Sequence, residues 1–84
     1  MRKWYVTYSL LSSNGSLNGT LEIGLGLHKD SSKQDVLEEA LSWMYKLEYT
    51  NPMVKIDYIV SEDGEEIDLS HINYSKYSRE YFGL

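Results

Sequence analysis

The 84-residue sequence predicts an α+β domain in which the elements follow the order β-β-α-β. Three segments alternate apolar and polar residues, the pattern of a half-buried strand. Between the second and third of these segments, apolar residues instead recur every three or four positions, the pattern of an amphipathic helix. A chain this short has room for one hydrophobic core. We therefore expect residues 1–84 to form one domain, with an antiparallel sheet of three or four strands and a helix on one face.

The first two strands should form a hairpin. Alternation covers residues 3–11 and 19–27, and Asn14-Gly15 between them provides the positive φ angles of a turn. In the second strand, Gly24 and Gly26 indicate a bulge, a close approach of another backbone, or simply a twisted strand with a thin outer face. The residues expected to face the helix are Trp4, Val6, Tyr8, Leu10, Leu21, Ile23, Leu25 and Leu27.

The helix should begin at a serine cap and end near Tyr49. Either Ser31 with Gln34 or Ser32 with Asp35 has the spacing of an N-cap and its third helical residue. Pro52 disfavours helical geometry at the residue before it. The expected buried stripe consists of Val36, Leu37, Ala40, Leu41, Met44 and Leu47.

A third strand follows over residues 54–61, and a right-handed crossover through the helix should place it beside the first strand. Asp63-Gly64 then offers a tight turn, after which residues 65–69 could return as a short fourth strand with Ile67 and Leu69 inward. The spacing of three tyrosines in the tail also predicts a short C-terminal helix. The third strand should turn Val54, Ile56, Tyr58 and Val60 toward the core.

Composition limits the compartment and the partners. Cysteine is absent, which fits a reducing compartment, and neither a signal peptide nor a stretch of about 20 apolar residues is visible. We expect a soluble cytoplasmic protein that does not bind membranes. Eight Lys and Arg stand against thirteen Asp and Glu, a formal charge of -5 that repels nucleic acid because the basic residues are scattered.

The sequence contains no catalytic or cofactor-binding pattern. Gly24-Leu25-Gly26 lacks the third glycine of a nucleotide-binding turn, and His28 and His71 share no metal-ligand spacing. The serines lie in turns and caps, where local hydrogen bonding explains them. Asp57, the one acid within an apolar strand, should lie on the outer face. We therefore expect no enzyme activity, no cofactor and no metal.

Two features suggest a binding surface. The first is Glu62-Asp63-Gly64-Glu65-Glu66-Ile67-Asp68, which has five acids in seven residues. Such a run is usually a solvated loop, but its charges could also mimic spaced phosphates and occupy a groove lined by Arg and Lys. Its candidate partner-binding residues are Glu62, Asp63, Glu65, Glu66 and Asp68.

The second feature is the number of aromatic residues. Eight tyrosines and two tryptophans exceed what so small a core can bury, and exposed rings are enriched at protein interfaces. The candidates in the tail are Tyr74, Tyr77 and Tyr81, which could instead close the open face of the sheet. The rings expected to be partly exposed are Tyr5, Tyr45, Tyr49, Tyr74, Tyr77 and Tyr81.

In size, acidity, lack of cysteine and its opening strand Met1-Arg2-Lys3-Trp4-Tyr5-Val6-Thr7-Tyr8, the chain resembles small accessory proteins of phages and prophages. Anti-CRISPR proteins belong to this group, and some of them inhibit host nucleases by mimicking DNA. The resemblance implies an inhibitor that binds a nucleic-acid-binding host protein. It transfers no residue role to this chain.

We therefore expect a non-catalytic protein-interaction module. One alternative is a binder of single-stranded nucleic acid that stacks bases on sheet aromatics such as Trp4, Tyr5 or Tyr8. Another is a regulatory subunit that forms homo-oligomers. All three hypotheses allow a homodimer, because an exposed sheet face or edge strand can pair with its copy.

Overall fold

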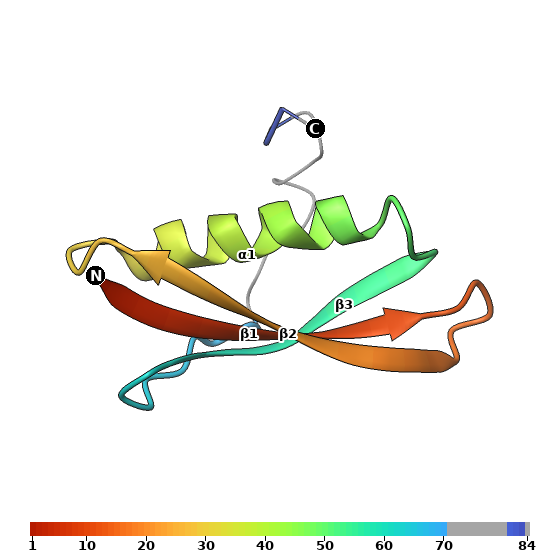
Figure 1. The fold of residues 1–84 in the computed structure, drawn as a ribbon, viewed down its shortest axis with the longest axis horizontal. Helices are drawn as coiled ribbons and strands as arrows, with labels where there is room; N and C mark the ends of the chain where they lie inside the picture. The colour runs from red at the N-terminus through yellow and green to blue at the C-terminus, as the bar shows by residue number, and fades with distance from the viewer. Residues whose placement is uncertain (71–80, 84) are drawn as a thin grey trace.

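A computed structural model of the chain describes residues 1–70 and 81–83. It contains β1 (Arg2–Leu11), β2 (Leu17–Leu27), α1 (Lys33–Leu47) and β3 (Met53–Ser61) (Figure 1). The three strands form an antiparallel sheet in the order β2-β1-β3. This is the predicted α+β fold, with the third strand beside the first. The expected C-terminal helix falls on residues outside those described.

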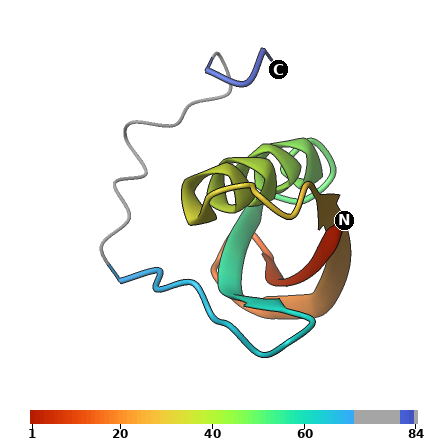
Figure 2. The same cartoon turned by 90° about the vertical axis from the view of Figure 1, so that its left-hand side faces the viewer.

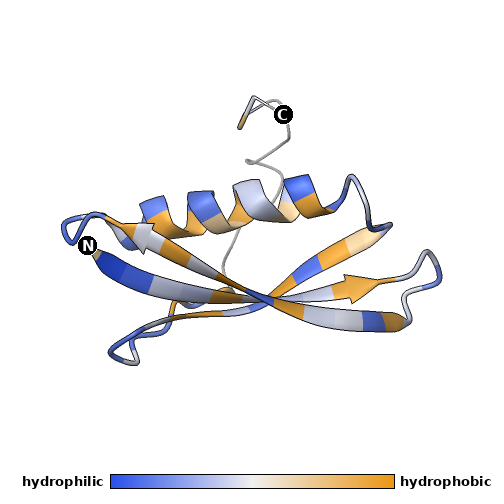
Figure 3. Cartoon of the chain, viewed as in Figure 1, coloured by the Kyte–Doolittle hydropathy of each residue, from blue (hydrophilic) through white to orange (hydrophobic). Residues whose placement is uncertain are grey.

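Helix α1 lies across one face of a strongly twisted sheet, and no described helix covers the other face (Figure 2). The apolar side of α1 points toward the strands and its polar side points away (Figure 3). The core is formed by side chains from all four elements and from the segment after β3. Its buried members are Trp4, Val6, Tyr8, Leu25, Val36, Leu37, Ala40, Leu41, Met44, Ile56, Ile59 and Ile67.

The first strand and the helix follow the predicted pattern. Ser32 caps α1, because its Oγ accepts the backbone N–H of Asp35 at 3.1 Å while the Asp35 carboxylate accepts the N–H of Ser32 at 2.9 Å. This capping box selects Ser32 over Ser31 as the helix start. At the centre of the core, the Tyr8 hydroxyl donates a 2.6 Å hydrogen bond to the backbone carbonyl of Ala40.

The prediction for β3 was wrong beyond Ile56. Tyr8 pairs with Ile56 and Thr7 with Tyr58, so Asp57 is an extra residue in a β-bulge. The bulge reverses the alternation, because it shifts every later side chain by one position. As a result Ile59 is fully buried, whereas Tyr58, expected inside, is 48% exposed.

The glycines of β2 do not mark a bulge. Pairing between β1 and β2 is regular from Arg2–Leu27 to Leu10–Gly19. The Tyr5 ring lies against Gly24, and a β-carbon built there would sit 3.8 Å from it. The single irregularity between the two strands lies next to the hairpin loop, between Leu10 and Leu11. Gly24 therefore belongs to the thin outer face that the sequence also allowed.

The expected fourth strand is reduced to a single bridge between Val60 and Glu66. The N–H of Ile67 donates to the carbonyl of Ile59 at 3.0 Å, and the Ile67 side chain is buried as predicted. Immediately afterwards the Asp68 carboxylate accepts the N–H and the hydroxyl of Ser70, so the chain turns locally instead of extending the sheet.

Candidate functional site

We call residues 62–68 the acidic turn. It begins with a tight turn in which the N–H of Gly64 donates to the carbonyl of Ser61 at 3.0 Å. Gly64 has a φ of 89°, a conformation that favours glycine. Ser61 is buried, and its Oγ accepts the N–H of Glu65 at 2.9 Å while its hydroxyl donates to Asp63. The predicted Asp63-Gly64 turn is therefore present, and the hydrogen bonds of the Ser61 side chain to Asp63 and Glu65 stabilise it.

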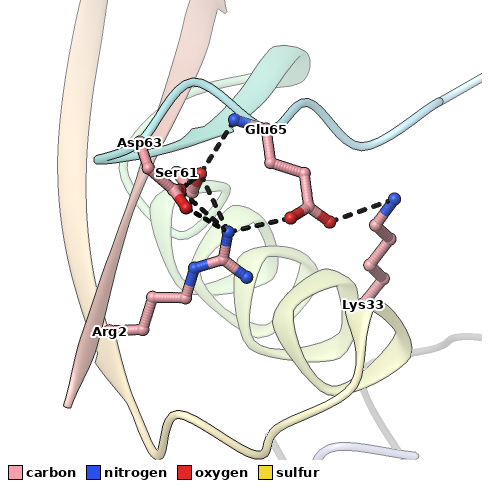
Figure 4. Close-up of polar contacts among 5 residues, drawn as sticks. All are labelled: Arg2, Lys33, Ser61, Asp63 and Glu65. Carbon is pink, nitrogen blue, oxygen red and sulfur yellow. Dashed lines mark hydrogen bonds and ion pairs between the residues drawn. The ribbon is translucent and has the colours of Figure 1, made fainter.

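Arg2 joins two of the five acids from the neighbouring strand (Figure 4). Its Nη2 atom lies 2.8 Å from Asp63 Oδ1 and 2.8 Å from Glu65 Oε2. The second carboxylate oxygen of Glu65 lies 3.1 Å from Lys33 Nζ at the start of α1. The guanidinium also stacks 4.7 Å from the centre of the Trp4 ring. We call Arg2, Lys33, Asp63 and Glu65 the Arg2 cluster, and its contacts connect β1, α1 and the acidic turn.

The same contacts lower two carboxyl pKa values. Hydrogen bonds from the Ser61 hydroxyl and the Arg2 guanidinium lower the pKa of Asp63 to about 2. Hydrogen bonds from Arg2 and Lys33 lower the pKa of Glu65. Both groups are therefore strongly held in the charged form, and their charges are matched by cations of the chain itself.

The remaining acids of the turn have different surroundings. Glu62 and Glu66 are exposed, and no hydrogen bond or ion pair joins their carboxylates to another residue in the described part of the chain. Asp68 is also exposed, and it caps Ser70. From the sequence, the five acids were predicted as one set. In the structure, two of them, Asp63 and Glu65, are paired with Arg2 although the Asp63 side chain stays 65% exposed, and the other three, Glu62, Glu66 and Asp68, form an exposed outward group.

The aromatic candidates are only partly described. Tyr74 and Tyr77 lie outside the described residues. Tyr81 is 53% exposed, and its hydroxyl donates to Glu38 Oε1 on α1 at 2.9 Å. Next to it, the centre of the Phe82 ring lies 5.0 Å from that of Tyr81 in an edge-on contact and 5.9 Å from that of Tyr45 in a tilted one. Tyr81 thus lies beside the acidic side of the helix.

A groove lies beside these rings and was not expected from the sequence. The groove has a volume of about 350 Å³, and three helix carboxylates line it. Their spacing of three and four residues puts them on one side of α1, a signal that was visible in the sequence. The lining residues are Leu27, Asp35, Glu38, Glu39, Ser42, Tyr81 and Phe82.

The uncovered face of the sheet carries Tyr5 from β1 and Tyr58 from β3. Tyr5 is half-buried beside Gly24, which confirms the predicted partial exposure of its ring. The exposure of Tyr58 was not predicted and results from the bulge. The extra residue Asp57 is held on this face by the Ser9 hydroxyl at 2.5 Å. Asp57 thus lies on the outside, as predicted.

The Arg2 cluster should make stability depend on pH. The folded pKa of Asp63 lies below its usual value of 3.8, so the stabilisation is present above pH 3.8 and is lost as the pH falls toward 2. The lowered pKa of Glu65 acts in the same direction. We expect Arg2→Met to lose the part of this stabilisation that comes from Arg2, while the hydrogen bonds from Ser61 and Lys33 remain, and to shift the acid-unfolding midpoint to higher pH, as monitored by circular dichroism. Lys29→Met, at an exposed loop lysine, should leave the midpoint unchanged, and equal midpoints for both variants would contradict the role of Arg2.

Within residues 1–70 and 81–83, no group of three or more His, Cys, Asp or Glu is arranged to hold a metal ion. No helix in this part of the chain is long and apolar enough to cross a membrane. No protein-family description, curated protein or solved structure matches the chain.

Proposed function

We propose that this protein is a non-catalytic interaction module that binds the basic surface of a nucleic-acid-binding protein and blocks it, as inhibitors encoded by phages and mobile elements do. The observation that carries the proposal is the acidic turn, in which Glu62 and Glu66 are exposed while Asp63 and Glu65 are held by Arg2. The two acids paired with Arg2 fix the turn, and the outward group of Glu62, Glu66 and Asp68 adds exposed charge for a partner to contact.

Pre-organisation makes such a turn a better ligand than a flexible acidic tail. A partner that binds it does not have to order the loop, so less conformational entropy is lost on association. Complementary charge also speeds encounter with a groove lined by Arg and Lys, since long-range attraction steers the two surfaces together. Both effects favour binding of a protein surface that normally receives phosphates.

The helix extends the negative surface. Lys33 contacts Glu65, so the first turns of α1 lie at the same end of the molecule as the acidic turn (Figure 4). Asp35, Glu38 and Glu39 follow in those turns and line the groove beside Tyr81. A basic partner could therefore contact the acidic turn and the helix together, with Tyr81 as an aromatic contact at the edge.

The outward group can be changed without changing the two acids that Arg2 holds. Replacing all five acids would also break the Arg2 cluster, so we choose Glu62→Gln, Glu66→Gln and Asp68→Asn in one variant. The matched control, Glu22→Gln, Glu48→Gln and Asp57→Asn, removes the same charge from other parts of the surface. Each immobilised protein is exposed to a nuclease-treated bacterial lysate, and captured proteins are identified by mass spectrometry and then titrated individually.

We expect the wild type and the control to capture a nucleic-acid-binding protein that duplex DNA displaces and that rising salt releases. The outward variant should bind the captured protein about 10- to 100-fold more weakly, as expected for the loss of three exposed ion pairs of about 0.5–0.9 kcal/mol each. Equal affinities of the outward variant and the control, or a captured partner that DNA does not displace, would contradict the proposal.

A second candidate function is supported by the open sheet face. Tyr5 and Tyr58 present rings on this face, and base stacking on aromatic residues is the usual platform for single strands. Glu22 and Asp57 lie nearby and repel phosphates. A labelled single-stranded oligonucleotide that shifts at low salt, and no longer shifts with Tyr5→Ala and Tyr58→Ala, would favour this function over the first.

A further inference from the structure

Among the described residues, strand β2 pairs with β1 alone and forms one edge of the sheet. The β2 residues opposite Trp4, Val6 and Tyr8 hydrogen-bond to β1 through their backbone N–H and C=O groups. The carbonyl of Lys3 accepts the backbone N–H of Glu62, so the backbone groups of Lys3 point toward β3. Because these groups alternate in direction along an antiparallel strand, those of Trp4, Val6 and Tyr8 point toward β2. The N–H and C=O groups that point outward therefore belong to Thr20, Glu22, Gly24 and Gly26.

This edge lacks the usual protection. Natural edge strands carry lysine, proline or bulges that discourage pairing with another chain. Residues 17–27 contain no Lys, Arg or Pro and a single acid, Glu22. Two of the four outward-pointing residues are glycines, which leave the backbone accessible to a second strand.

The opposite edge of the sheet is different. Strand β3 contains a bulge, and its last residues are already hydrogen-bonded to the acidic turn. The backbone N–H of Ser61 donates to the carbonyl of Glu65 at 2.8 Å, and the carbonyl of Ile59 accepts the N–H of Ile67. Lys55 is exposed on this strand as well. The two edges are thus unequal, and β2 is the one suited to pairing.

An incompletely covered apolar row runs along the same strand. Leu21, Ile23, Leu25 and Leu27 alternate toward the side on which α1 lies, but only Leu25 is buried. Leu21 is 36% exposed, and Ile23 and Leu27 are partly buried. One helix does not cover this side of β2, so apolar surface remains at this edge.

We propose that β2 pairs antiparallel with β2 of a second copy, which makes a continuous six-stranded sheet with both helices on one face. A twofold axis at Ile23 or Gly24 brings the half-covered leucines and isoleucines of the two copies together. In either register Glu22 lies opposite a glycine, Gly24 or Gly26 of the second copy, so the two carboxylates do not face each other. Because β3 lies at the far edge, each copy keeps its acidic turn exposed and the dimer presents two of them.

The first experiment measures mass against concentration by analytical ultracentrifugation. The wild type should move from 9.8 kDa to twice that mass as its concentration rises. Glu22→Pro removes an outward N–H without removing a bond to β1 and should weaken the dimer about 10- to 100-fold, since two hydrogen bonds are lost per dimer. Glu22→Ala removes the same side chain, keeps the N–H and should leave dimerisation intact. Added salt should strengthen the dimer, because each copy carries a charge of -5.

The second experiment does not depend on the folding of the proline variant. The chain has no cysteine, so Ile23→Cys or Gly24→Cys introduces a single thiol next to the expected twofold axis. The Cα atoms of directly opposed residues lie about 4.5–5.5 Å apart, within disulfide range. Oxidation should crosslink one of these variants much faster than Lys55→Cys on the other edge. A wild type that stays monomeric at about 1 mM, or equal crosslinking of all three variants, would overturn the proposal whatever the outcome for the acidic turn.

Discussion

Replacement of Tyr8 by alanine is expected to lower the free energy of unfolding by about 3–5 kcal/mol, as for other fully buried aromatic rings. The side chain of Tyr8, on β1, is completely buried below α1 and is one of the largest in the core. Its removal would leave a cavity below the helix and delete the hydrogen bond to Ala40. Urea unfolding followed by circular dichroism measures the loss.

Tyr8→Phe separates the ring from the hydroxyl. It keeps the packing and removes only the hydrogen bond, so we expect a loss of about 0.5–1.5 kcal/mol. A Tyr8→Ala variant that is no less stable than Tyr8→Phe would contradict the central position of this ring.

The same pair of proteins predicts a difference at high pH. Burial, with a smaller contribution from the charge of Glu39, raises the pKa of Tyr8 above its usual value of 10. The neutral phenol is therefore favoured in the folded state, and its stabilisation is complete below pH 10 and declines above it. Wild type should lose more stability between pH 9 and about 11 than Tyr8→Phe does.

The second large effect is expected at Ile59. Ile59→Ala should lower the free energy of unfolding by about 2–5 kcal/mol, because the side chain is fully buried against β1 and α1. Tyr58→Ala, one residue earlier, should change it by no more than about 0.5 kcal/mol, because the ring is on the uncovered face. A regular strand without the bulge would give the opposite ranking, so this pair of variants tests the bulge directly in the same urea experiment.

The sequence was sufficient where one pattern had one interpretation. In β1 the alternation of Trp4, Val6 and Tyr8 leaves no other set that could face the core, and all three are buried. The helix was equally well determined, since its apolar stripe and its Ser32 cap agree. Period and capping are local properties, and they can be recognised without knowledge of the neighbours.

The sequence was insufficient in β3 because Tyr58, Ile59 and Val60 are all apolar. Either alternate set could have been turned inward, and the pairing with β1 decided it by placing Asp57 in a bulge. A bulge is a property of two strands in register, so a single strand does not reveal it.

The candidate site shows the same limit. The acidic turn was visible as five acids around Asp63-Gly64, but which of them form ion pairs depends on Arg2, which is about 60 residues away in sequence. The groove beside Tyr81 likewise depends on contact between the chain end and the helix.

The order of the elements, the hydrophobic faces of β1 and α1, the tight turns and the net negative charge follow from the sequence alone, because each is set by residues close together in the chain. Tertiary structure decided which residues of β3 are buried, which acids are paired with Arg2 and Lys33, and which edge of the sheet has no second strand beside it in the described part of the chain. These outcomes depend on pairs of residues that only the folded chain brings into contact, so the interaction energies of these pairs arise only when the strands are in register.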